Sequence, residues 1–159
     1  MFSHILCPVD GSDAAMLALQ VAARLAAEQK ARLSVCSVAD PVKASVMAFG
    51  NPEGTSLCLE TLDSEASGIA QQAVKLVSNI VPAESVALEG EAVDAIVEYA
   101  KQSDCDVIVM GSHGRSGIPR AIVGSVAEGV LRRSTIPVMI IRWTKPAHKT
   151  HEPELPDRP

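Results

Sequence analysis

Strand-like and helix-like patterns alternate along this chain, and the alternation constrains its fold more than any other feature. Five strands are predicted by short apolar or alternating runs at residues 5–9, 33–38, 85–89, 106–110 and 136–141. Apolar residues spaced by three and four predict helices over 13–30, 62–80, 92–100 and from Ser125 onward. A parallel neighbour can be reached only by crossing over a face of the sheet. The sequence therefore predicts an α/β fold, a doubly wound five-stranded parallel sheet with helices on both faces.

Two segments lack any sustained period. Residues 42–56, which include Gly50-Asn51-Pro52 and Gly54, are expected to form a mobile connection. Within it, Met47 and Phe49 either cover a bound ligand or, as is more usual for apolar loop residues, pack as satellites of the core. Residues 144–159 hold four prolines and no apolar period, so we expect a disordered tail after a single domain over 1–143.

Composition excludes several classes of partner. The net charge is −5 and only four residues are aromatic, which leaves neither a basic surface for phosphodiester backbones nor a stacking platform for bases. No apolar run is long enough to cross a membrane, and no basic region leads into an apolar one at the amino terminus. We therefore expect a cytoplasmic protein that binds neither nucleic acid nor membrane.

The four cysteines are expected to be reduced and structural. Cys7, Cys36, Cys58 and Cys105 are widely spaced, without a C-x-x-C pair or a histidine at ligand spacing. A free thiol in a strand behaves as a small buried apolar group.

A glycine-rich segment follows the fourth predicted strand. The run Met110-Gly111-Ser112-His113-Gly114-Arg115-Ser116-Gly117 is followed by Gly124-Ser125, where a helix begins, so the pattern is G-x2-G-x9-G-S. Glycines let the backbone approach a ligand closely, and the free N–H groups of the next helix attract an anion. This segment therefore predicts a phosphate-binding loop.

Two better-known phosphate loops do not match. A Walker A loop needs a lysine before the Ser/Thr at the helix start, whereas Gly124 precedes Ser125 here. A dinucleotide fingerprint needs G-x-G-x-x-G after the first strand, whereas Gly111, Gly114 and Gly117 are evenly spaced after a late one.

Asp10 follows the first strand and supplies a hydrogen-bond acceptor, in contrast to the donors of the glycine loop. In a doubly wound sheet, ligands bind at the carboxyl ends of the strands, where the winding reverses. If the first and fourth strands are neighbours there, Asp10 faces the glycine loop across one crevice. Its carboxylate only accepts hydrogen bonds, while Gly111–Gly114 and the helix start at Ser125 only donate them. Because a carboxylate beside phosphates would repel them, the two must bind opposite ends of one ligand, and a nucleoside phosphate has such ends.

The residues assigned to ligand binding could instead have purely structural roles. Asp10 serves equally well as a turn or capping residue, and Ser125 as a helix N-cap that also contacts phosphate. Gly111, Gly114 and Gly124 could form a tight turn without a ligand, but their set spacing before a helix favours binding.

The chain resembles the universal stress protein family over about residues 1–142. The resemblance is carried by Pro8-Val9-Asp10-Gly11-Ser12, by Val38, and by the glycine loop continued as Gly124-Ser125-Val126-Ala127-Glu128. It implies the strand order 3-2-1-4-5, ATP or a related adenine nucleotide in the crevice, and a cytosolic homodimer joined through the last strand. It implies no settled catalytic reaction.

Similarity to the ATP-binding branch of the family also implies site residues. Asp10 would hold the adenosine, and the backbone of Val38 would contact the base. Gly111, Gly114, Gly124 and Ser125 would surround the phosphates. Met110, His113 and Val126 would form the walls of the site. The implied nucleotide-binding residues are Pro8, Val9, Asp10, Val38, Met110, Gly111, His113, Gly114, Gly124, Ser125 and Val126.

No catalytic residue is predicted. His113 is the one histidine near the loop, and no acid beside it in sequence orients it as a base, so a wall or phosphate contact is favoured. Arg115 and Arg120 either neutralise phosphate or face solvent.

Three functions remain open. A stress-response regulatory protein would bind ATP, with Mg²⁺ or Mn²⁺ as its companion cation, and change its dimer or the 42–56 connection. A slow ATPase or nucleotide-cleaving enzyme is the alternative. An interaction module that keeps the glycines only for folding is the third.

Overall fold

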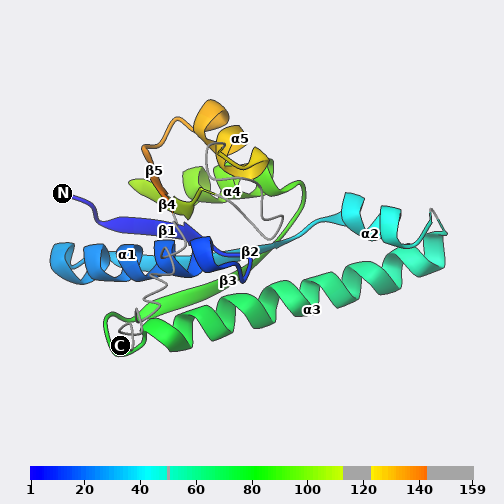
Figure 1. Cartoon of the computed structure of the whole chain (residues 1–159), viewed down its shortest axis with the longest axis horizontal. Helices are drawn as coiled ribbons and strands as arrows, with labels where there is room; N and C mark the ends of the chain where they lie inside the picture. Colours follow the sequence, from blue (N-terminus) through cyan, green and yellow to red (C-terminus); the bar gives the residue numbers. More distant parts are fainter. Residues whose placement is uncertain (50, 113–122, 143–159) are drawn as a thin grey trace, which may run out of the picture.

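The computed structural model describes residues 1–49, 51–112 and 123–142 (Figure 1). In chain order its elements are β1 (His4–Pro8), α1 (Asp13–Gln29), β2 (Arg32–Ala39), α2 (Pro41–Met47), α3 (Pro52–Val77), β3 (Ala83–Glu89), α4 (Ala92–Gln102), β4 (Val107–Gly111), α5 (Ser125–Arg133) and β5 (Val138–Ile141). The predicted tail, 144–159, lies outside the described residues. In the described part of the chain, no helix is long and apolar enough to span a membrane.

The sheet has five strands in the order β3-β2-β1-β4-β5, and all pairs are parallel. β1 is central, with Leu6 beside Ser34 of β2 on one side and Ile108 of β4 on the other. The winding reverses between β1 and β4. The predicted α/β fold and strand order are confirmed.

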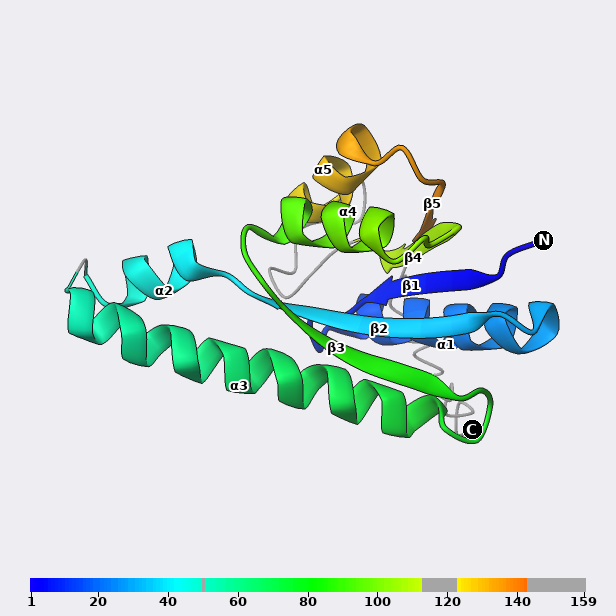
Figure 2. The same cartoon turned by 180° about the vertical axis from the view of Figure 1, so that it is seen from behind.

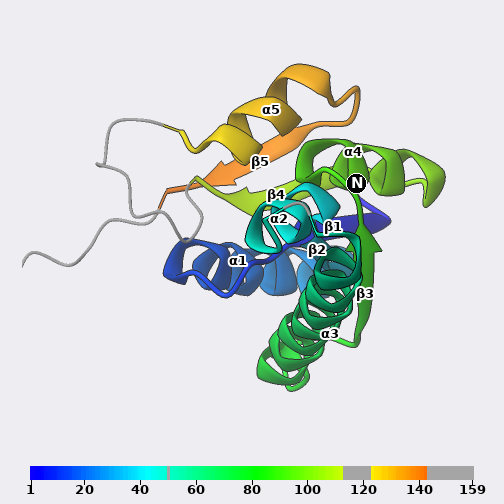
Figure 3. The same cartoon turned by 90° about the vertical axis from the view of Figure 1, so that its right-hand side faces the viewer.

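Helices cover both faces of the sheet, as Figure 3 shows. Side chains alternate along β1, so Ile5 and Cys7 pack with α1 and the carboxyl-terminal part of α3. Leu6 points the other way and packs with α4 and α5. Each face therefore has its own apolar core, and the carboxyl ends of β1, β2 and β4 share one edge.

The expectation that residues 42–56 lack regular structure is wrong, because most of this segment is helical. α2 occupies Pro41–Met47, and α3 begins at Pro52 with Asn51 as its N-cap, whose side chain accepts a hydrogen bond from the Glu53 N–H at 3.1 Å. The two helices extend past the carboxyl edge of the sheet (Figures 1 and 2). α2 spans only seven residues, and Gly50-Asn51-Pro52 and Gly54 follow it, so the sequence shows no sustained helical period here.

Met47 and Phe49 are neither core satellites nor a cover over the cavity described below. Their exposed fractions are 60% and 99%, and neither residue lines that cavity.

α5 lies close against α4. A Cβ added to Gly129 would meet Cγ2 of Val93 at 2.6 Å. The absence of a side chain at Gly129 therefore lets the two helices approach closely.

Candidate functional site

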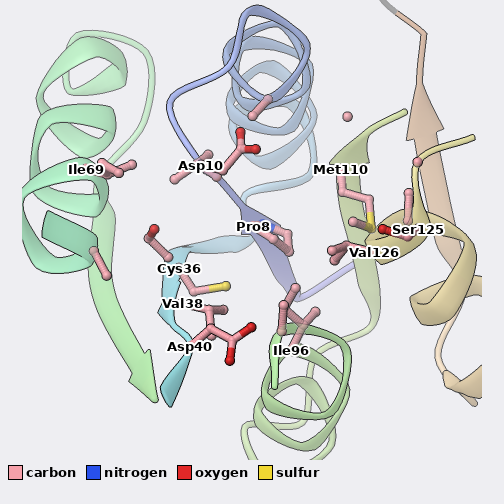
Figure 4. Close-up of a pocket in the computed structure, with 18 of the residues that line it drawn as sticks. Pro8, Asp10, Cys36, Val38, Asp40, Ile69, Ile96, Met110, Ser125 and Val126 are labelled. Atoms are coloured by element: carbon pink, nitrogen blue, oxygen red, sulfur yellow. The ribbon is translucent and has the colours of Figure 1, made fainter. Parts of the chain in front are cut away.

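A cavity of about 390 Å³ opens at the carboxyl ends of β1, β2 and β4, at the point where the winding reverses (Figure 4). α3, α4 and the start of α5 complete its walls. Its lining residues are Pro8, Val9, Asp10, Ala15, Cys36, Ser37, Val38, Asp40, Leu62, Glu65, Ala66, Ile69, Ala92, Ile96, Met110, Gly111, Ser112, Gly124, Ser125, Val126 and Ala127.

Nine of the eleven site residues expected from the sequence line this cavity together. They are Pro8, Val9, Asp10, Val38, Met110, Gly111, Gly124, Ser125 and Val126. The other two, His113 and Gly114, lie outside the described residues, as do Arg115 and Arg120.

Asp10 supplies a carboxylate at the end of β1. Its Oδ1 accepts a hydrogen bond from the Ser12 N–H at 3.0 Å, which forms an Asx turn, and Gly11 adopts a φ of 82° within it. Ser12 then caps α1 by accepting from the Ala15 N–H at 3.3 Å. Asp10 therefore does form the turn, and that turn places its side chain on the cavity wall, so the structural and binding roles are compatible.

Backbone donors meet the cavity at the start of α5. Gly124 is the N-cap and makes no side-chain capping hydrogen bond, so the expectation that Ser125 is the N-cap is wrong. The Gly124 N–H donates to the Ser112 carbonyl at 2.7 Å, which ties the helix start to the end of β4. Ser125, Val126 and Ala127 open the helix and all line the cavity. Amide N–H groups of a first helical turn have no partner within the helix, and they attract anions.

Gly111 has a structural reason to be glycine that the sequence did not reveal. A Cβ at this position would lie 2.7 Å from the carbonyl carbon of Ala14, 2.8 Å from its oxygen and 2.9 Å from the Ala15 nitrogen. These are backbone atoms of the first turn of α1. The end of β4 and the start of α1 therefore touch directly, which brings the Asp10 turn close to the donor side of the cavity.

The sequence analysis missed the walls contributed by α3 and α4. Leu62, Ala66 and Ile69 on α3, and Ile96 on α4, give the cavity apolar sides. Their spacing of three and four was visible in the sequence, but it does not say which helix passes the mouth of the crevice.

Two further carboxylates were also missed. Asp40 and Glu65 lie on the cavity wall, and Oδ1 of Asp40 accepts a hydrogen bond from the Val42 N–H at 2.9 Å. Asp40 directly follows β2, as Asp10 follows β1, and that equivalence was the available signal. The acceptor side of the cavity is therefore richer in negative charge than Asp10 alone indicated.

Burial keeps the thiol that lines the cavity in its protonated form. Cys36 is fully buried, and desolvation raises the pKa of its thiol far above the ordinary value. Burial likewise raises the pKa of Cys7 to about 12. All four cysteines are free, and the structural role expected for the buried ones fits these environments.

A model of the universal stress protein family matches residues 1–142, which covers every element of this fold. The chain belongs to the universal stress protein family. The resemblance of its motifs to that family is thereby confirmed. Universal stress protein YxiE of Bacillus subtilis is 32% identical over 151 residues, which span 89% of this chain and all of the relative.

Solved members of the family share the architecture. Universal stress protein UspA from Lactobacillus plantarum is 30% identical, with a TM-score of 0.75 over 88% of this chain and 97% of that protein. A universal stress protein solved in complex with cAMP is 26% identical, with a TM-score of 0.64 over 89% of this chain and 97% of that protein.

Proposed function

We propose that this universal stress protein binds an adenine nucleotide, ATP, in the cavity between the ends of β1 and β4, and that it acts as a regulatory protein. One observation carries the proposal: carboxylates and the uncapped start of α5 line the same cavity. An acceptor side suits hydroxyl and amino groups, and a donor side suits phosphate. The solved family member in complex with cAMP supports an adenine nucleotide as the ligand class.

Electrostatics gives the ligand one orientation. Phosphates beside Asp10, Asp40 or Glu65 would be repelled, so they belong at Gly124 and Ser125. The ribose then lies at Asp10. The base lies on the apolar side of the cavity formed by β2 and α3.

The walls formed by the described residues do not offer a ready-made metal site. Within residues 1–49, 51–112 and 123–142, no group of three or more His, Cys, Asp or Glu side chains could hold a metal ion. A Mg²⁺ or Mn²⁺ ion accompanying ATP would therefore take its oxygen ligands mainly from the phosphates and water.

Calorimetric titration tests the proposal. ATP is expected to bind saturably to one site per chain, and Asp10→Asn is expected to weaken binding by about 10- to 100-fold, because a hydrogen bond to a charged acceptor contributes about 1.5–3 kcal/mol. Asparagine keeps an oxygen to accept the Ser12 N–H, so the turn persists. Asp13→Asn, an exposed acid three residues away that does not line the cavity, is the matched control and should bind like the native chain.

Two results would contradict the proposal. One is the absence of saturable binding by ATP. The other is an equal loss of affinity in Asp10→Asn and Asp13→Asn. Chromatography of the same mixtures should show unchanged ATP, whereas steady product formation would favour the slow ATPase over a binding protein.

We further propose that the protein is a cytoplasmic homodimer joined through β5. Among the described strands, β5 pairs only with β4, and the outer edge of such a strand can pair with a second copy. Sedimentation equilibrium should then give about twice the chain mass of 16.7 kDa. A monomer at micromolar concentration would exclude this contact.

A further inference from the structure

An arm formed by α2 and the first half of α3, residues 41–63, projects beyond the carboxyl edge of the sheet (Figures 1 and 2). The part of it that the structure describes exposes large apolar side chains. They are Val42 at 62%, Val46 at 71%, Met47 at 60%, Phe49 at 99% and Leu57 at 66% exposure. These are five of the ten large apolar side chains found exposed in the described residues. Half of the large apolar side chains exposed in the described residues therefore lie in one short segment.

The exposed side chains lie on the outer side of the arm. α2 packs toward α3 through Ala44, which is fully buried, and through Ala48, whose Cβ lies 3.3 Å from a Cβ added to Gly54. Val42 and Val46 are four residues apart and share a helix face. That face lies away from the one that carries Ala44 and Ala48. The apolar face of α2 thus points to solvent.

Phe49 adds a sign of strain at the same place. It adopts a φ of 51°, in the left-handed region that bulky side chains rarely occupy. Its ring is 99% exposed, so no burial within the chain offsets that conformation. Strained backbone positions cluster at functional sites, so this outlier motivates a functional hypothesis for the segment around Phe49.

Charge indicates the kind of partner. The arm contains three carboxylates, Glu53, Glu60 and Asp63, and one lysine, a net charge of −2. On α3, Leu57 has Glu53 four residues before it and Glu60 three residues after it, which places an exposed apolar side chain between two exposed acids on one face. Apolar side chains among acids complement a segment that carries apolar residues flanked by Lys or Arg.

We propose that the α2–α3 arm is a docking surface for a basic, amphipathic segment of a partner protein. A second copy of the arm is a poor occupant, because it would set acids against acids. An anionic lipid surface would be repelled for the same reason. The proposal does not depend on the nucleotide, so its test is done without ATP.

Fluorescence anisotropy with three labelled 14-residue helical peptides tests the proposal on the full chain. The first peptide contains leucine and lysine at amphipathic spacing. The second has glutamate in place of each lysine, and the third has serine in place of each leucine. Saturable binding is expected for the leucine–lysine peptide only, with affinity falling as salt is added. Equal binding of the serine–lysine peptide would mean charge attraction alone and would overturn the proposal.

Matched variants locate the contact. Val46→Ser with Phe49→Asn is expected to weaken peptide binding at least about tenfold, because a few large side chains contribute most of the binding energy at such interfaces. Asparagine tolerates a positive φ, so the thermal midpoint should stay equal or rise. Leu76→Ser, an equally exposed leucine (67%) near the far end of α3, should leave binding unchanged. Equal losses in both variants would overturn the proposal.

Two measurements test the other occupants. Co-sedimentation of the native chain with vesicles of phosphatidylcholine, or of phosphatidylcholine with phosphatidylserine, would make the arm a membrane surface and overturn the proposal. A lower sedimentation mass for Val46→Ser with Phe49→Asn would make it a self-interface, with the same consequence. The expected result is no vesicle binding and an unchanged mass.

Discussion

Replacing Ser125 by glutamate is expected to abolish ATP binding while leaving the fold intact. Ser125 is the first residue of α5, is exposed and lines the cavity on its donor side. A carboxylate about 4 Å from a phosphate charge costs about 4 kcal/mol at an effective dielectric constant of 20, which corresponds to roughly a 1000-fold loss of affinity. The same carboxylate is favourable for the helix, because negative charge in a first turn interacts well with the helix dipole. Calorimetric titration and thermal unfolding measured on one preparation separate the two effects.

Ser125→Gln is the control for the size of the new side chain. Glutamine has nearly the shape of glutamate without its charge, so it is expected to weaken ATP binding far less than glutamate does. If both variants lose the same affinity, obstruction and not charge is responsible. If Ser125→Glu binds ATP like the native chain, the phosphates do not lie at the start of α5, and the proposed orientation of the ligand is wrong.

Adding a single methyl group at Gly111 is expected to destabilise the protein severely. In Gly111→Ala the new Cβ would overlap the backbone of Ala14 and Ala15, at distances of 2.7 to 2.9 Å. Backbone atoms of a helix packed on a strand cannot rotate away as a side chain can, so α1 must shift from β4. We expect a loss at the upper end of the range for overpacked cores, about 3 kcal/mol, and a fall in the thermal midpoint on the order of 10 °C.

Gly68→Ala is the matched control for Gly111→Ala. Gly68 lies within α3, and a Cβ added there would meet no atom within 4 Å. Because alanine is favoured over glycine inside a helix by about 1 kcal/mol, this variant should be slightly more stable than the native chain. Circular dichroism melts of the two variants should therefore move in opposite directions. A Gly111→Ala melt that matches the native one would contradict the close approach of α1 to β4.

Most of the fold could be predicted from the sequence, because strand and helix patterns depend only on residues close together in the chain. Five apolar strands alternating with amphipathic helices allowed one sheet architecture, and the order β3-β2-β1-β4-β5 implied by the family resemblance is confirmed. The helices within residues 42–56 were not predicted from the sequence. α2 and the start of α3 are helical, yet Val46 and Phe49 face solvent. α2 has only seven residues, which is too short for a sustained period, and Gly50, Pro52 and Gly54 after it are residues typical of loops.

Some residues of the candidate site could likewise be predicted from the sequence, and others could not. Asp10 and the residues around Gly124 were found from motifs, because each follows a strand or precedes a helix, whereas Val38 was implied only by the family resemblance. Asp40, which also follows a strand, was missed because no motif marked it. The α3 wall was missed because its position depends on where a helix far along the chain crosses the sheet.

By itself, the sequence determined the alternation of strands and helices, the placement of a carboxylate after the first strand, and glycines after the fourth. These are local properties, set by side-chain pattern and backbone freedom within a few residues. Only the tertiary structure decided that Gly111 is needed for the contact between β4 and α1, that α3 closes the cavity, and that the arm exposes its apolar side. Each of these depends on the distance between segments far apart in the chain, and such distances are set by packing of the whole fold.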